Sequence, residues 1–391
     1  MDLRKQFVLS AIAAGANVSA LCREFGISRT NGYKWISRFK KQGEVGLESQ
    51  SRRPRRSLAI EGETVVRILE LSQRFRWGPK KLRQLLINEY GLTRVPSAKT
   101  IARILDRVGQ PKIRQPRHRS RVVFRRREAL TVYAPNDVWT VDFKGWWRTR
   151  DGKKFEPLTV RDDFSRFVLC LQMLGSTRAE GVKAAFEALF QTYGLPKVIR
   201  VDNGAPFACT SAPCGLSRLS AWWISVGVHV SFSRPAHPQD NGGHERMHAD
   251  VAAELEAEAS DSIEAQQRAA DAWRRCFNQV RPHEALAMRR PADLYHRSPR
   301  SFRGIKNPSY PANFARRVVS KKGCVRYVGK TIFISEALIG HLIALRRKGN
   351  RSVIARFYQL DLGSFELLTA PPYHPPRLFP STPNSPLHHV A

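Results

Sequence analysis

Apolar residues recur every three or four positions through the first hundred residues, and this spacing predicts helices. The helices fall into two groups, over residues 18–25 and 28–41 and over residues 65–71, 79–90 and 97–105. We expect Asn17 and Ser28 to cap the helices of the first group, with Gly26 in the turn between them. A helix, a tight turn and a second capped helix are typical of a helix-turn-helix unit.

The second helix of each such pair carries a polar face that suits the major groove of DNA. Tyr33, Ile36 and Phe39 are predicted to face the core of the first unit. The side chains that we expect to contact DNA are Arg29, Thr30, Asn31 and Lys34 in the first unit and Lys80, Lys81, Lys99, Thr100 and Arg103 in the second. An ordinary helical bundle with a solvated polar face is the alternative.

The middle of the chain changes to a pattern of strands and helices. Strands are predicted over residues 138–143, 155–160, 167–173, 197–201 and 228–232, and helices over residues 177–192, 216–226 and 241–259. Short strand-like runs, separated by glycine turns, follow within residues 311–370 and predict a small β-barrel. Residues 371–391 contain seven prolines, which indicates a disordered tail.

The distribution of charged residues indicates what kind of partner the chain binds. The 391 residues include 66 Lys and Arg against 33 Asp and Glu, a net charge of +33. Residues 1–130 have a net charge of +20 and residues 311–391 of +9, whereas residues 131–310 have only +4. Two basic ends around a nearly neutral core indicate a polyanionic partner, most simply nucleic acid.

Composition excludes several classes of protein. The 42% hydrophobic content argues against a disordered chain, and no apolar run is long enough to span a membrane. The stretch Phe7 to Cys22 resembles a secretory signal, but its pattern continues into the next helix. Six scattered cysteines fit a reducing compartment, so we expect a cytoplasmic, DNA-associated protein.

Two basic segments connect the predicted domains. We interpret residues 51–60 as a linker along the DNA backbone, because it carries Arg52, Arg53, Arg55 and Arg56 beside a proline. Residues 111–130 are interpreted as an extended basic arm.

Two aspartates stand out in the core. Asp142 lies within an apolar strand and Asp202 at the end of another, where a carboxylate is unfavourable unless it is paired or binds a metal. If the two strands are parallel neighbours, the carboxylates meet at one edge of the sheet. Oxygen ligands of this kind suit Mg²⁺ or Mn²⁺.

Three motifs occur in order: Trp139-x-x-Asp142-Phe143-Lys144-Gly145, Val201-Asp202-Asn203-Gly204-x-Pro206-Phe207, and Pro238-Gln239-x-Asn241-Gly242-x-His244-Glu245-Arg246-Met247-His248. Together they resemble the integrase core of bacterial insertion-sequence transposases, which are relatives of retroviral integrases. The resemblance covers roughly residues 1–300.

The resemblance implies an RNase H-like core with a mixed sheet, whose catalytic and metal-binding residues are Asp142, Asp202 and Glu245. Forty-two residues separate Asp202 from Glu245, where many relatives have about 35; the surplus falls in the loop Ala208 to Ser220. Lys144, Gln239, Asn241 and Arg246 are expected to position phosphates, although Arg246 could instead pair with Asp250 on the same helix.

The resemblance also implies the reaction. Two Mg²⁺ or Mn²⁺ ions would support cleavage of double-stranded DNA at terminal inverted repeats, and the freed 3′-OH would then be joined to target DNA. A homo-oligomer, at least a dimer when bound to DNA, and no membrane partner are expected.

Other interpretations remain open. The string His244-Glu245-x-x-His248 has the form of a zinc-protease motif, Cys209 and Cys214 could be half of a zinc site, and Asp162 and Asp163 could compete as metal ligands. For the histidines we expect surface or DNA-facing positions, and for the aspartates a hairpin turn. A catalytically idle, transposase-derived DNA-binding regulator is the alternative function.

The chain is therefore expected to be multidomain, with all-α helix-turn-helix units, an α/β core and a small β-barrel. The boundaries are a helix-turn-helix domain at 1–50, the linker at 51–60, a second helix-turn-helix domain at 61–110, the arm at 111–130, the catalytic core at 131–300, the barrel at 311–370 and the tail at 371–391.

Overall fold

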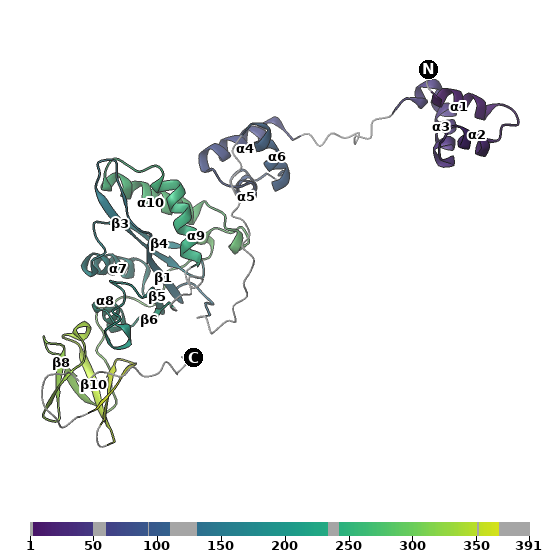
Figure 1. Cartoon of the computed structure of the whole chain (residues 1–391). Coiled ribbons are helices and arrows are strands. Elements are labelled where there is room, and N and C mark those ends of the chain that lie inside the picture. The colour runs from purple at the N-terminus through teal and green to yellow at the C-terminus, as the bar shows by residue number, and fades with distance from the viewer. Residues whose placement is uncertain are drawn as a thin grey trace. The chain divides into compact units, whose positions relative to one another are not determined.

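The structure is a computed structural model, and it describes residues 3–49, 60–92, 94–109, 131–233, 242–349 and 352–366. The chain separates into two compact units, Met1–Thr64 and Val65–Ala391. Figure 1 shows helices in the N-terminal part, a sheet covered by helices in the middle and strands near the C-terminus. No helix in the described ranges is long and apolar enough to cross a membrane.

The first unit contains three helices, α1 (Leu3–Ile12), α2 (Val18–Glu24) and α3 (Arg29–Gln42), followed by the 3₁₀ turn η1 (Gly43–Leu47). Asn17 accepts backbone hydrogen bonds at the start of α2, and Ser28 accepts one from the Asn31 N–H at the start of α3. Both predicted caps are thus present, and they begin the helices where the sequence places them.

The buried face of α3 differs from the prediction at one position. Tyr33 is 52% exposed. Gly32, its neighbour, is buried instead, because a Cβ atom there would lie 2.6 Å from the Cys22 sulfur and 2.9 Å from the Phe7 ring. The close approach of α3 to α1 and α2 rotates Tyr33 toward the polar face.

The second group of helices comprises α4 (Gly62–Phe75), α5 (Pro79–Tyr90) and α6 (Ala98–Arg107). Pro79 lies in the first turn of α5, Gly91 ends that helix in the left-handed conformation, and Ser97 caps α6. These start and stop residues agree with the sequence pattern.

The core contains a mixed sheet of six strands. Its elements in chain order are β1 (Val138–Phe143), β2 (Trp147–Arg148), β3 (Lys154–Asp162), β4 (Val168–Leu174), α7 (Ala179–Tyr193), β5 (Val198–Val201), η2 (Pro213–Gly215), α8 (Arg218–Ser225), β6 (His229–Phe232), α9 (Gly242–Val251), η4 (Ala252–Glu256), α10 (Ile263–Gln279), η5 (Glu284–Leu286) and η6 (Pro291–Asp293). The strand order is β2-β3-β1-β5-β6, with β4 on β3. β1 is antiparallel to β3 and parallel to β5, which is in turn parallel to β6.

The sheet is covered on both faces. On one face, Trp139 and Val141 of β1 join a buried cluster with Phe186 of α7 and Trp223 of α8. A second cluster joins the sheet to α9 and α10, and Figure 1 shows these helices across the sheet from α7 and α8. Because side chains alternate along a strand, Thr140 and Asp142 lie on the opposite face of β1 from Trp139 and Val141.

The predicted helix over residues 241–259 is shorter in the structure. The α-helix α9 ends at Val251, and a π-helical turn, η4, follows. Sequence spacing missed α10 altogether, although this helix buries Trp273 and Phe277 against the same cluster.

The C-terminal strands are β7 (Ala315–Val318), β8 (Cys324–Tyr327), β9 (Lys330–Phe333), β10 (Leu342–Lys348), β11 (Ser352–Phe357) and β12 (Leu360–Glu366), with η7 (Glu336–Leu338) between β9 and β10. They form a four-stranded sheet, β12-β11-β10-β7, and a separate hairpin, β8-β9. The strand-like runs read from the sequence do not include β10, which lies between β11 and β7. The described strands do not close on one another, so the barrel remains a prediction.

Candidate active site

Asp142 and Asp202 lie at the same edge of the sheet. Asp142 is near the end of β1 and Asp202 directly follows β5. The two strands are parallel neighbours, with Thr140 opposite Arg200 two residues before each aspartate. This parallel pairing is the condition under which the sequence argument expects the two carboxylates to meet.

Helix α9 carries the third acidic residue, Glu245, to the same region. His244, Met247 and Val251 of α9 are buried, whereas Glu245 is exposed. The pKa of Asp142 is raised from 3.8 to about 6, first by burial, then by the negative charge of Asp202, and to a smaller extent by that of Glu245. Asp202 and Glu245 are therefore both close enough to Asp142 to disfavour its charged form.

The two histidines that flank Glu245 lie against the sheet, so the expectation of surface positions is wrong. His244 is fully buried, and its Nε2 lies 2.8 Å from the Thr140 hydroxyl and 3.1 Å from the Thr140 carbonyl oxygen. The His248 Nε2 lies 2.9 Å from the Thr159 hydroxyl. Burial is the main cause that holds the pKa of His248 at about 4 and that of His244 well below its ordinary value, so both rings are neutral at pH 7.

Thr159 connects these histidines to the first aspartate. Its hydroxyl donates to the backbone carbonyl of Asp142 at 2.8 Å. A hydroxyl has one proton, so the Nε2–H of His248 must donate to Thr159 for both bonds to form. Sequence analysis did not identify Thr159, because a threonine in a strand has no distinguishing signal until the pairing of β3 with β1 is known.

Asp142, His244 and His248 form the one group of three potential metal ligands in the described ranges whose ligand atoms all lie within 4.8 Å of one another. Asp142 is thus the third potential ligand beside the two histidines of the string that has the form of a zinc-protease motif. The adjacent acidic residues Asp202 and Glu245 add further oxygen donors, which suits a hard divalent cation.

Arg161 fixes how closely the start of α9 approaches the sheet. Its side chain is buried and pairs with Asp163 at 2.9 Å, and Arg200 pairs with the same carboxylate at 3.2 Å. A Cβ atom on Gly243 would fall on the Arg161 guanidinium, so the first turn of α9 lies directly on this arginine.

The other carboxylates and thiols have local roles. Asp162 accepts hydrogen bonds from the Asn136 N–H at 2.7 Å and the Ser165 N–H at 2.8 Å, consistent with the turn that we expected. Cys209 and Cys214 are free thiols, and the Cys214 sulfur donates to the carbonyl oxygen of Asp361 at 3.3 Å. Within the described ranges, neither cysteine belongs to a group of metal ligands.

The residues expected to position phosphates differ in their surroundings. The Lys144 side chain is largely buried, forms an ion pair with Glu256 and lies 5.0 Å from the centre of the Trp147 ring. Arg246 is exposed, and Asp250, its suggested partner, pairs instead with Arg281 at 2.9 Å. Gln239 and Asn241 lie outside the described residues, as do Arg52, Arg53, Arg55 and Arg56.

The helix-turn-helix residues are mostly accessible. Arg29, Thr30, Asn31, Lys34, Lys80, Lys99 and Arg103 are exposed, and Lys81 and Thr100 are half-buried. Lys80 forms a surface ion pair with Glu284 at 2.8 Å, which adds little stability because both side chains are solvated.

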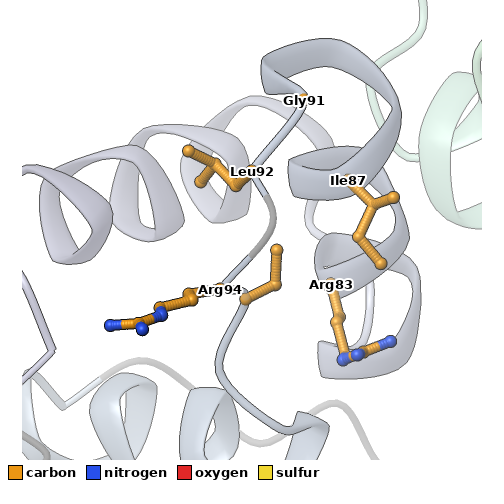
Figure 2. A pocket seen from close by; sticks show the side chains of 6 residues that line it. Arg83, Ile87, Gly91, Leu92 and Arg94 are labelled. Atoms are coloured by element: carbon orange, nitrogen blue, oxygen red, sulfur yellow. The ribbon is translucent and has the colours of Figure 1, made fainter.

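Two hollows in the part of the chain that the structure describes lie away from the carboxylates. One, of about 470 Å³, lies between α5 and the loop after it and is lined by six residues that include Arg83, Gly91 and Arg94 (Figure 2). Another lies along β4 and α10. The residues that line these two hollows do not include Asp142, Asp202 or Glu245.

Comparison with known families agrees with this geometry. Residues 132–238 match an integrase core domain, and residues 226–291 match a second family model of the same description. The chain carries an integrase core domain. Residues 4–55 also match a helix-turn-helix domain and residues 31–105 a homeodomain-like domain, so helix-turn-helix domains precede the integrase core.

Two relatives are insertion-element proteins. The IS476 uncharacterized 39.2 kDa protein of Xanthomonas euvesicatoria is 29% identical over 232 residues, which are 58% of this chain and 63% of that protein. The IS407 uncharacterized 31.7 kDa protein of Burkholderia multivorans is 28% identical over 230 residues, 58% of this chain and 79% of that protein. The chain thus spans somewhat less than two thirds of the IS476 protein.

Among solved structures, the HTLV-2 integrase catalytic core domain in complex with magnesium is 19% identical with a TM-score of 0.33, and the match covers 42% of this chain and 98% of that one. The family models and the insertion-element relatives confirm the predicted resemblance to bacterial insertion-sequence transposases with an integrase-like core.

Proposed function

We propose that the protein is a DNA transposase that cleaves the ends of an insertion sequence and joins the freed 3′-OH groups to target DNA. The observation that carries this proposal is the pairing of β1 with β5. It places Asp142 and Asp202 at one sheet edge, while α9 packs on the same face and carries Glu245.

In this proposal Asp142, Asp202 and Glu245 would hold two Mg²⁺ or Mn²⁺ ions. The residues fit such ions, because burial and, after it, the charges of Asp202 and Glu245 raise the pKa of Asp142, and a nearby cation would stabilise its charged form. Divalent cations bound there would activate the attacking oxygen and stabilise the leaving oxygen of the phosphodiester. The chain itself would position these carboxylates. The His248–Thr159 contact acts on Asp142, and the Arg161 guanidinium supports the first turn of α9, which carries Glu245.

The flanking parts would supply DNA binding. The helix-turn-helix domains, with their exposed Arg29, Asn31, Lys99 and Arg103, are proposed to bind the terminal inverted repeats. Joining two ends requires two active sites, so we propose at least a dimer on DNA and a bacterial, DNA-associated location. The C-terminal strands are proposed to form a small barrel-like module that assists assembly.

A cleavage assay tests this function. The full chain would be incubated with Mg²⁺ and duplexes that carry the sequences flanking the encoding gene on either side. We expect strand cleavage at a defined position that leaves a 3′-OH and is lost in Asp202→Asn, with DNA binding largely retained.

Other outcomes would overturn the proposal. Specific binding without cleavage in Mg²⁺ or Mn²⁺ would favour the idle regulator. Stoichiometric zinc together with peptide hydrolysis would favour the metallopeptidase, for which Asp142, His244 and His248 provide the three ligands.

A further inference from the structure

The hairpin that follows Asp142 has two different faces. It comprises residues 144–154, with β2 paired to the start of β3 so that Trp147 lies opposite Phe155 and Arg148 opposite Lys154. Trp147 and Phe155 are buried, whereas Trp146, Arg148 and Lys154 are exposed. We refer to these last three side chains as the outer face of the hairpin.

Trp146 differs from the other tryptophans of the chain. Seven of the eight are buried or half-buried, and Trp146 is 55% exposed. Two cations flank its ring, with the Lys154 Nζ 4.7 Å and the Arg148 Cζ 5.9 Å from the ring centre. A large apolar ring kept in water beside two cations indicates a binding surface and not a packing position.

The hairpin also carries the net charge of the core. Residues 131–310 contain 24 basic and 20 acidic residues, and residues 144–154 alone contain five basic and one acidic. The rest of the core is therefore neutral in sum, and its positive excess equals that of the hairpin. The net positive charge that would attract a polyanion to the core therefore lies on the hairpin.

The inner face fixes the hairpin to the proposed catalytic helix. The centres of the Trp147 and Phe155 rings lie 4.7 Å apart, and both residues belong to the same buried cluster as Met247 and Val251 of α9. Lys144 pairs with Glu256, just after α9. The outer face is thus held by the element that carries Glu245.

Chain length limits how far Trp146 lies from Asp142. Four residues span at most about 14 Å between Cα atoms. Successive nucleotides along one strand rise by about 3.4 Å. A base that contacts Trp146 would therefore lie within about four nucleotides of a phosphate held at Asp142.

We infer that the outer face binds an unpaired DNA base, which stacks on Trp146 while Arg148 and Lys154 hold the adjoining phosphates. Within paired DNA both faces of each inner base are covered by its neighbours, so a tryptophan ring can stack on a frayed or flipped base or on the outer face of the last base pair, and the fully paired reference duplex separates these cases. The inference rests on the proposed function, and it specifies that the DNA end is opened next to the cleavage position.

The ion pairs on the hairpin do not oppose this binding. Lys154 lies 3.4 Å from Glu156, whose side chain is 17% exposed, Lys153 lies 3.2 Å from Asp151, and Arg150 lies 3.4 Å from Asp261 with both side chains exposed. The cation of each pair faces solvent, and ion pairs in contact with solvent are weak, so a phosphate can compete for these cations. A second copy of the chain is the competing occupant of Trp146, and the experiment below distinguishes it.

Fluorescence of 2-aminopurine, an adenine analogue quenched by stacking, tests the inference. The full-length protein would be titrated in EDTA, so that no cleavage occurs, with a duplex ending in four unpaired nucleotides that include the analogue. A fully paired duplex of the same sequence is the reference. We expect quenching on the open duplex and preferential binding of it.

Matched variants separate the contributions. Trp146→Ala should abolish the quenching and reduce the preference for the open duplex by about 5- to 150-fold, while Trp146→Phe should retain both. Arg148→Gln with Lys154→Gln should weaken binding of both duplexes. Tyr90→Ala serves as a control, because Tyr90 is 38% exposed with the Arg67 Cζ 4.7 Å from its ring centre but lies outside the core.

The unfolding temperature of Trp146→Ala is compared with that of the wild type, so that a loss of binding is not a loss of folding. If the variant unfolds at a lower temperature, Trp146→Phe and the double variant Arg148→Gln, Lys154→Gln provide the comparison instead. An unchanged preference in Trp146→Ala overturns the inference, and loss of self-association in sedimentation would assign the ring to a second copy. Quenching without cleavage in Mg²⁺ would instead overturn the proposed function alone.

Discussion

At the scale of single residues, Asp142 carries the most information. Its burial beside Asp202 and Glu245 raises its pKa to about 6, which means that its charged form is unfavourable in the folded chain. The same repulsion that destabilises the carboxylate makes the position favourable for a divalent cation. Stability and function therefore act in opposite directions at this side chain.

This opposition predicts the effect of Asp142→Asn. The folded-state pKa exceeds the ordinary value of 3.8, so the folded chain binds the proton more tightly than the unfolded chain. The penalty is absent below about pH 4, grows as the pH rises to about 6, and is complete above it. In EDTA at pH 8 we expect the variant to gain about 1–3 kcal/mol in its free energy of unfolding.

Urea unfolding at pH 4, 6 and 8 measures this gain. At pH 4 wild type and variant should be nearly equal, which serves as the internal control. Added Mg²⁺ should stabilise the wild type more than the variant. An equal or lower stability of Asp142→Asn at pH 8 would contradict the assigned electrostatics.

Thr159 allows a second prediction at this scale. Thr159→Val removes the hydroxyl that accepts from His248 and donates to the Asp142 carbonyl, and leaves the shape nearly unchanged. We expect cleavage to slow roughly tenfold, about 1.4 kcal/mol, as the position of Asp142 relative to α9 loosens. Thr159→Ser keeps the hydroxyl and should remain close to wild type in single-turnover assays, with DNA affinity unchanged in both variants.

At the scale of secondary-structure elements, the docking of α9 on the sheet decides whether Glu245 approaches Asp142. His244, Met247 and Val251 fill the buried face of the helix, and the Arg161 guanidinium lies beneath its first turn. The ion pairs of buried Arg281 with Asp250 and Glu254 secure the other end. The helix is thus fixed at both ends by contacts with distant parts of the chain.

Two adjacent glycines at the start of α9 test this docking. Gly243→Ala would place a methyl group on the Arg161 guanidinium, and because this guanidinium is buried and paired with Asp163, we expect the first turn to lift from the sheet and carry Glu245 away. We expect at least a tenfold loss of cleavage, corresponding to a shift of about an ångström in the catalytic geometry. Gly242→Ala meets no atom within 4 Å and is the matched control, expected to retain activity. Equal activities of the two variants would refute the role of Arg161.

At the scale of the whole molecule, the charge is divided between parts. Residues 1–130 hold +20 of the total of +33, and the core holds +4. The neutral core can therefore concentrate carboxylates for metal binding while the basic ends hold DNA. Affinity and chemistry should then respond to different substitutions.

Salt dependence measures this division. Replacing Arg52, Arg53, Arg55 and Arg56 by Gln should lower the slope of log affinity against log salt by up to about four, since each lost phosphate contact removes about 0.9. Fluorescence anisotropy titrations between about 50 and 200 mM salt would measure this slope, because log affinity falls about linearly with log salt in that range. Asp202→Asn should leave the slope unchanged, and a reduced slope there would mean that the core contributes to DNA affinity.

Local patterns predicted much of the fold because the causes are local. The caps at Asn17 and Ser28, the helix predicted over residues 79–90 and the strand that contains Asp142 each depend on residues a few positions apart. The exposure of Tyr33 was mispredicted because the close packing of α3 decides it. The strand β10 was missed because its burial between β7 and β11 decides it.

The sequence by itself determined the helix-turn-helix pattern and the distribution of charge, and it selected the three candidate acidic residues, since each of these depends on neighbouring positions or on ordered motifs. Only the tertiary structure decided that His244 and His248 face the sheet, that Thr159 joins them to Asp142, that Arg161 lies beneath Gly243 and that Trp146 stays in water. Most of these contacts join residues tens to a hundred positions apart, so they form only when strands pair and helices dock. The exposure of Trp146 depends on which face of its hairpin the rest of the fold covers.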